Sequence, residues 1–221
     1  MKKRILSILL LCCMVLTMLP TTVLAADGPM DTIPKYDVSI DVYNRTSDIS
    51  IKDSRSYYIY SSVPDKLRDT WAWDKKIFIK GDKTAPHVFI DGVNIEMSPS
   101  SKGPAIELNK KASAYIYFIG KNSSLQGADG RAAIQKNRSE GQLYVLARTG
   151  TTVTCKGGDK AAGIGGSYAT RNISNGYYNG DMYGHGVNMH FGSQSNPDYW
   201  GGTIAAIGGE GGAGIGGGQG G

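Results

Sequence analysis

The sequence predicts an all-β protein folded as a parallel β-solenoid, similar to a right-handed β-helix, with turns of roughly 28–30 residues. The segment 157–164, GGDKAAGI, aligns with the segment 127–134, GADGRAAI, at its glycine, aspartate, alanine and isoleucine positions. The string Gly-Ile-Gly-Gly occurs at 163–166 and again at 214–217. Self-similarity near 30 residues, built from short strands and glycine turns, is typical of a solenoid.

Short runs in which apolar and polar residues alternate supply the expected strands, because alternation with period two is the pattern of a half-buried strand. Turn residues, mostly glycine, separate these runs. No long segment has apolar residues at helical spacing, and one short helix is expected over 63–73. The apolar positions of the alternating runs are Val38, Ile40 and Val42; Ile77 and Ile79; Val88 and Ile90; Ile116 and Phe118; and Leu143 and Val145.

One isoleucine in each copy of the repeat is expected to point inward and to stack on its equivalents, about 4.8 Å apart, in a continuous core. These residues are Ile106, Ile134, Ile164 and Ile215, at spacings of 28, 30 and 51 residues. The last spacing is 21 residues longer than the one before it. We therefore expect an insertion at about 168–200, a segment rich in Tyr and Gly.

The glycine motif is interpreted as a corner of the coil, where small residues let the chain bend and let neighbouring turns approach closely. A larger residue at Gly165 or Gly166 is expected to clash or to need a left-handed backbone. The segment 212–217 also matches G-x-G-x-x-G, but more glycine follows it instead of a helix, which argues against a dinucleotide site. The structural repeat residues are Gly163, Ile164, Gly165, Gly166, Gly214, Ile215, Gly216 and Gly217.

The first 26 residues have the pattern of a secretory signal peptide: a basic head, an apolar run from Ile5 to about Leu19, and small residues before the cleavage point. The mature chain is therefore expected to be secreted or at the cell surface, with no membrane span. We expect N-terminal strands and the short capping helix in 27–76, and solenoid repeats in 77–221. Because the sequence stops within what should be another turn, we expect the solenoid to be truncated at its C-terminus.

Charge and cysteine content exclude some functions. Loss of Lys2, Lys3 and Arg4 with the signal lowers the formal net charge from +5 to +2, so no basic face for nucleic acid is expected. Cys155 is then the lone thiol of the mature chain, which excludes an internal disulfide. Its place in an alternating run predicts a small buried residue.

Several segments resemble the repeat region of secreted Gram-positive, mostly clostridial, surface proteins that are commonly described as carbohydrate-binding-domain proteins. The resemblance covers residues 48–221, and the glycine motif is its most specific part. It implies an exported, parallel β-solenoid-like module within a larger multidomain surface protein. The segments are DISIKDSRSYYI at 48–59, VFIDGVNIEM at 88–97, AIELNKKASAYIYFIGKNSSL at 105–125, and AGIGG at 162–166 and 213–217.

Exposed aromatic side chains favour a non-catalytic role in adhesion or carbohydrate contact, with a glycan or a host or cell-wall surface as partner. Sugars stack on rings that combine an apolar body with a polar tip, and loops on a rigid scaffold often carry binding residues. Packing of the insertion's tyrosines onto the coil is the structural alternative. The candidate contact residues are Tyr115, Tyr117, Tyr177, Tyr178, Tyr183, Tyr199 and Trp200.

Two alternatives stay open. One is a polysaccharide lyase or glycoside hydrolase of the β-helix type using Asp129 and Asp159, which align one turn apart, although aspartate is also common in turns for its backbone preferences. The other is a structural spacer without a ligand. His87, His185 and His190 do not have metal-ligand spacing, and neither a metal nor a cofactor is expected.

Overall fold

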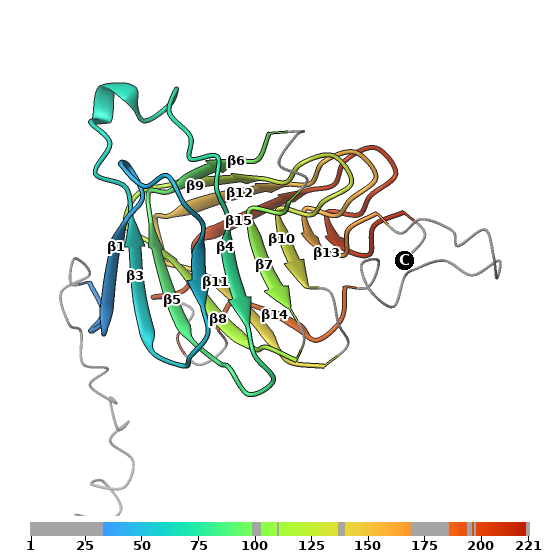
Figure 1. Ribbon diagram of the computed structural model, residues 1–221, viewed down its shortest axis with the longest axis horizontal. Helices are drawn as coiled ribbons and strands as arrows, with labels where there is room; N and C mark the ends of the chain where they lie inside the picture. The colour runs from blue at the N-terminus through green and yellow to red at the C-terminus, as the bar shows by residue number, and fades with distance from the viewer. Residues whose placement is uncertain are drawn as a thin grey trace, which may run out of the picture. The chain divides into compact units, whose positions relative to one another are not determined.

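The computed structural model describes residues 33–98, 103–109, 111–136, 140–168, 186–193, 196 and 198–219. Within these residues the chain is almost entirely β-structure, and all paired strands run parallel in three sheets (Figure 1). The predicted all-β parallel solenoid is confirmed. The described part contains no helix long and apolar enough to cross a membrane.

Each sheet collects strands from successive turns of the coil. Sheet 1 contains β1 (Val38–Asp41), β3 (Ser56–Tyr60), β5 (His87–Asp91), β8 (Ala114–Ile119), β11 (Leu143–Ala147) and β14 (Met189–Phe191). Sheet 2 contains β6 (Asn94–Glu96), β9 (Ser123–Gln126), β12 (Thr152–Lys156) and β15 (Thr203–Ile207). Sheet 3 contains β2 (Ile49–Ile51), β4 (Ile77–Lys80), β7 (Ile106–Asn109), β10 (Ile134–Lys136), β13 (Ile164–Gly165) and β16 (Ile215–Gly216).

The chain passes from sheet 1 to sheet 2 and then to sheet 3 in each complete turn, as in β5–β6–β7 and in β8–β9–β10. Among the described strands four turns are complete in this sense, and the last of them is β14–β15–β16. The stacked sheets already include β1, β2 and β3, which lie within residues 27–76. Strand β14 lies within the expected insertion at 168–200 and belongs to sheet 1.

The predicted isoleucine ladder is confirmed residue by residue in sheet 3. Ile106, Ile134, Ile164 and Ile215 are direct partners on consecutive strands, and the ladder continues upstream through Ile77 to Ile49. All members except Ile215 are at most 2% exposed, whereas Ile215 is 47% exposed. Burial of each inner isoleucine stabilises the fold by about 1.5–3 kcal/mol, which makes this ladder a main part of the core.

Sheet 2 places Cys155 in the core. Its neighbours in the ladder are Leu125 and Ala206, and its own exposure is 0%. Burial raises the pKa of the Cys155 thiol, so the residue stays protonated and unreactive. The expectation of a small buried residue is therefore confirmed.

The tight packing expected at the glycine motif is confirmed at Gly165. Gly165 has a φ of +129°, and a Cβ added there would lie closer than 3.0 Å to the carbonyl oxygen of Gly216 on the next turn. Gly163 faces the backbone of Ile207 and Gly214 in the same way. Neighbouring turns thus approach through bare backbone, which explains the glycine motif.

The helix expected over 63–73 is replaced by a single 3-10 turn, η1 (Asp65–Leu67), within an irregular segment. We call residues 63–73 the strap, because they project from the coil beside sheet 2 (Figure 1). Trp73 ends the strap with a parallel bridge to Ile95, and its indole N–H donates to the carbonyl of Arg45 at 2.8 Å. This extended anchor, only 3% exposed, is incompatible with a helix that continues to residue 73.

Candidate binding groove

The aromatic residues predicted on β8 point outward from sheet 1, since their neighbours Ile116 and Phe118 are fully buried. Tyr115 belongs to a column of stacked rings formed by successive turns. Its members are His87, Tyr115, Tyr144 and His190, with centroid separations of 4.7, 4.6 and 4.4 Å and interplanar angles of 6°, 9° and 13°.

Within this column Tyr115 and Tyr144 each have a neighbouring ring stacked on both faces. Sugar stacking requires a free ring face, so the geometry favours a stabilising role for Tyr115 and Tyr144. Aromatic pairs of this kind contribute about 0.5–1.5 kcal/mol each beyond the area that they bury.

A second column carries the other predicted residues that the structure describes. Tyr117 stacks on Phe89 at 4.9 Å and contacts Trp200 at 5.1 Å, with a tilt of 40°. Tyr199 packs edge-on against Trp200, and its hydroxyl accepts a hydrogen bond of 2.7 Å from Arg148. Tyr199 and Trp200 therefore lie against the outer face of sheet 1. The remaining predicted contact residues, Tyr177, Tyr178 and Tyr183, lie outside the described residues.

Asp129 and Asp159 lie on neighbouring turns at the same corner, where the Gly130 N–H donates to the Asp159 carbonyl. Both side chains are exposed, and Asp159 forms an ion pair with Lys160 at 3.7 Å. Among the residues that the structure describes, no group of three or more His, Cys, Asp and Glu residues could hold a metal ion. His185 is not among these residues.

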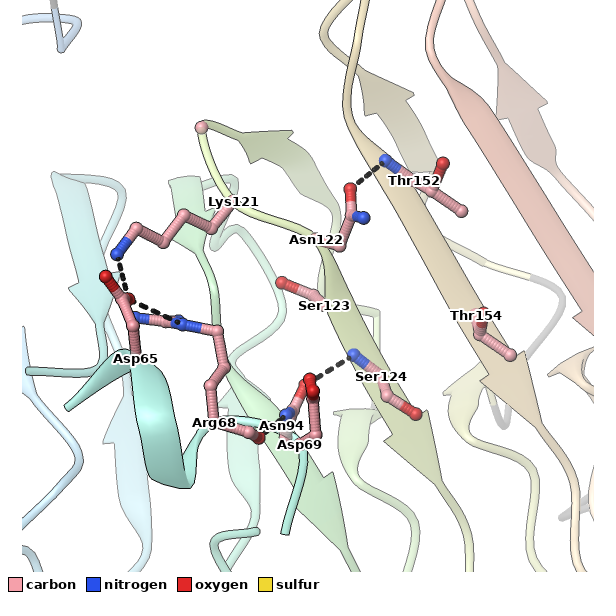
Figure 2. Close-up of a pocket in the computed structure, with 11 residues that line it drawn as sticks. Asp65, Arg68, Asp69, Asn94, Lys121, Asn122, Ser123, Ser124, Thr152 and Thr154 are labelled. Atoms are coloured by element: carbon pink, nitrogen blue, oxygen red, sulfur yellow. Dashed lines mark hydrogen bonds and ion pairs between the residues drawn. The ribbon is translucent and has the colours of Figure 1, made fainter. Parts of the chain in front are cut away.

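The outer face of sheet 2 carries a feature that the sequence analysis missed: a groove of about 710 Å³ between the strap and strands β6, β9 and β12 (Figure 2). All of its lining residues except Gly120 have polar or charged side chains. The lining residues are Asp65, Arg68, Asp69, Asn94, Gly120, Lys121, Asn122, Ser123, Ser124, Thr152 and Thr154.

An ion-pair network fixes the wall of the groove that the strap provides. Asp65 accepts hydrogen bonds from Lys121 Nζ at 2.7 Å and from Arg68 Nε at 3.4 Å (Figure 2). The bond from Lys121 holds the pKa of the Asp65 carboxyl below its usual value, and Arg68 acts in the same direction. Arg68 also donates to the carbonyls of Gly92 and Val63, so both cations are engaged within the wall.

Asn94 joins the strap to the floor of the groove. Its Nδ2 donates to the carbonyl of Arg68 at 2.9 Å, and its Oδ1 accepts from the backbone N–H of Ser124 at 3.0 Å. Asn122 makes a similar link one turn later, because its Oδ1 accepts from the backbone N–H of Thr152 at 2.8 Å. The floor is thereby held rigid before any ligand arrives.

Several polar groups in the groove are open to a ligand, since no described residue forms a hydrogen bond or ion pair with them. They are the hydroxyls of Ser124, Thr152 and Thr154, the Nδ2 of Asn122 and the carboxylate of Asp69. Ser124 and Thr154 are direct partners on β9 and β12, so their hydroxyls repeat with the coil. The groove thus combines fixed walls with free donors and acceptors.

A second groove, of about 460 Å³, is lined by Glu96, Gln126 and Asp129 and by Thr70 of the strap, among others. A smaller hollow beside Trp71 shares lining residues with both grooves. The two grooves and the hollow between them therefore form one continuous depression between the strap and sheet 2. Asp129, one of the two predicted catalytic candidates, lines it, whereas Asp159 does not line any of these hollows.

Part of this site was visible in the sequence as polar residues in alternating runs, at Ser124 and at Thr152-Val153-Thr154. The strap that walls the groove was not, because its position depends on contacts with distant turns. Comparison of the chain with protein-family models, with curated proteins and with solved structures found no match.

Proposed function

We propose that this protein is an exported, non-catalytic β-solenoid module that binds carbohydrate, through the groove between the strap and sheet 2. The observation that carries the proposal is the set of open hydroxyl and amide groups on a floor that internal hydrogen bonds hold rigid, with the Asp69 carboxylate on the strap beside it. A preformed site binds without the entropic cost of ordering its own side chains.

The chemistry of the lining suits a sugar better than an apolar ligand. A sugar presents a dense array of hydroxyls, each of which both donates and accepts hydrogen bonds. The groove offers acceptors at Asp69, a donor at Asn122, and hydroxyls with both capacities at Ser124, Thr152 and Thr154. Its volume of about 710 Å³ lies within the range of ordinary ligand sites.

The expected location agrees with this role. The signal-like residues 1–26 and the resemblance to clostridial surface proteins favour export, and the resemblance itself favours contact with carbohydrate. In this proposal the tyrosines of sheet 1 stabilise the coil. Tyr199 and Trp200 form the alternative aromatic contact site, and a double variant of these two residues distinguishes it from the groove.

A glycan-array screen of residues 27–221 tests the proposal; the compact unit begins at Ile33, so this segment contains all of it. Saturable binding is expected, and the double variant Ser124→Ala/Thr154→Ala should weaken it. The control variant Ser39→Ala/Ser50→Ala removes two exposed hydroxyls from the outer rows of sheets 1 and 3 and should bind normally. A loss confined to Tyr199→Ala/Trp200→Ala would transfer the site to the aromatic face.

The alternatives predict different results in the same samples. A β-helix enzyme using Asp129 and Asp159 would release new reducing ends or unsaturated products from a polysaccharide. A spacer would bind nothing, although its β-sheet circular dichroism would be normal. Either result would overturn the proposal.

A further inference from the structure

We infer that the groove binds an extended, neutral polysaccharide whose chain runs along the solenoid axis, with about one sugar residue over each turn. The inference rests on the proposed function and specifies the ligand class and its direction.

The direction follows from the register of sheet 2. Asn94, Ser124 and Thr154 are direct partners on β6, β9 and β12, so a polar side chain recurs at the same position on each turn. The repeat distance is about 4.8 Å, close to the length of one hexose in an extended β-linked chain. A ligand along the axis therefore meets a neutral polar side chain on each turn, and at Ser124 and Thr154 that side chain is an open hydroxyl.

A ligand that ran along the strands would meet a different pattern. Outward positions on one strand are about 6.6 Å apart. On β12 they carry Thr152, Thr154 and then Lys156, so the third position presents a cation instead of a neutral polar group. The axial direction therefore places neutral polar groups at a spacing close to that of the sugars, which the strand direction does not.

The ends of the row set the length of chain that it accommodates. At one end the strap closes the groove, where the carbonyl of Arg68 accepts from Asn94. At the other end the partner of Thr154 is Ala205, which has no polar side chain. The row therefore spans about three turns and should hold about three sugar residues.

The four charged side chains of the groove lining sum to zero, so the groove offers an acidic sugar no net positive charge. Both cations of the lining, Arg68 and Lys121, are already paired with Asp65. Asp69 is exposed and has no ion-pair partner among the described residues, so an approaching uronate would face a like charge. A neutral sugar would instead donate hydroxyl hydrogens to that carboxylate, and such charge-assisted bonds are strong.

Isothermal titration of residues 27–221 with oligosaccharide series tests the inference. The neutral probes are β-1,4-glucan, β-1,4-mannan and β-1,4-xylan oligomers, from disaccharide to hexasaccharide; the acidic probes are oligogalacturonides of the same lengths. For at least one neutral series, affinity should rise up to about the trisaccharide or tetrasaccharide and then level off. The acidic series should bind at least tenfold more weakly at low salt.

Variants assign these effects to residues. Thr154→Ala should lower the affinity for the neutral tetrasaccharide by about fivefold, as expected for one lost hydrogen bond, and Ser50→Ala should not change it. Asp69→Asn should reduce the discrimination against the acidic series.

The outcomes separate the inference from the proposal on which it rests. Affinity that does not depend on length, tighter binding of the acidic series, or array binding without binding of any neutral series would overturn the inference alone. Absence of binding to every glycan would overturn the carbohydrate proposal itself.

Discussion

Gly165 shows how a single residue limits the spacing between turns. Its φ of +129° is rarely adopted by residues with a side chain, and a Cβ would press on the backbone of Gly216. Gly150 also has a positive φ, of +83°, but a Cβ there would meet no atom within 4 Å. A substitution at Gly150 therefore introduces backbone strain alone, whereas a substitution at Gly165 introduces strain and steric overlap together.

Gly165→Ala should lower the free energy of unfolding by more than 3 kcal/mol, since roughly 1–3 kcal/mol of strain is joined by overlap with the next turn. Gly150→Ala should cost only the strain, about 1 kcal/mol. Urea denaturation followed by circular dichroism measures both. Equal losses would contradict the tight approach of the two turns.

Lys136 is an unexpected residue in the core-facing row of sheet 3, where its ladder partner is Leu108. It is only 2% exposed, and its Nζ donates to the carbonyl of Glu140 at 3.0 Å. Burial lowers the pKa of Lys136 from its ordinary value of 10.5. Between the lowered pKa and 10.5, the unfolded chain binds more protons than the folded chain, so stability from this group rises with pH.

Lys136→Leu should remove that alkaline rise and increase stability at neutral pH by about 1 kcal/mol, because an apolar side chain fits the row without desolvation of a charge. Urea midpoints of both proteins, measured from neutral pH to 10.5, provide the test. A rise of the same slope in the variant would show that other groups cause it.

At the scale of elements, the column of rings on sheet 1 ties successive strands together outside the core. Tyr115 stacks between His87 and Tyr144, and its hydroxyl has no hydrogen-bond partner among the described residues. The ring, not the hydroxyl, should therefore carry the stabilisation.

Tyr115→Ala should lower the free energy of unfolding by about 2 kcal/mol, through loss of two stacking contacts and of half-buried area. Tyr115→Phe should retain the wild-type value. Neither substitution should alter glycan binding if the groove on sheet 2 is the site. If the Tyr115→Ala variant is fully folded but binds glycan more weakly, the aromatic face of sheet 1 is the contact surface.

The strap shows what local sequence cannot supply. Pro64 and Asp65 suit a first helical turn, and the structure has η1 there, but the segment then extends to reach the Trp73 bridge. That bridge depends on Ile95, whose position is set by the stacking of sheet 2. The groove has the same origin, since its lining joins residues from Asp65 to Thr154.

At the scale of the whole molecule, the isoleucine ladder was predictable where the glycine motif marks each copy. Ile106, Ile134, Ile164 and Ile215 follow directly from that alignment. Ile49 and Ile77 belong to the same ladder but lack the motif, so sequence spacing alone did not reveal them. The sequence therefore predicted the ladder where the glycine motif is present. The two copies without the motif were identified only from the strand pairing in the structure.

The same substitution can be compared at a buried and at a half-exposed position of the ladder. Ile106→Ala should destabilise the protein by about 3–4 kcal/mol, because the side chain is fully buried between two turns. Ile215→Ala should cost about 1 kcal/mol or less, since 47% of that residue is exposed. Chemical denaturation of the two variants measures the difference. Equal losses of unfolding free energy in the two variants would contradict a main role of the buried ladder in stability.

The equivalence of Ile134 and Ile164 has a consequence for how such a protein changes in evolution. These residues occupy one position on consecutive turns, 30 residues apart. Loss of residues 135–164 would join Ile134 to Gly165 and let β8 pair with β14 and β9 with β15 in the register that β11 and β12 now set. An in-frame gain or loss of one whole turn, which is thirty codons between these two isoleucines, would therefore lengthen or shorten the coil and keep the core rows in register.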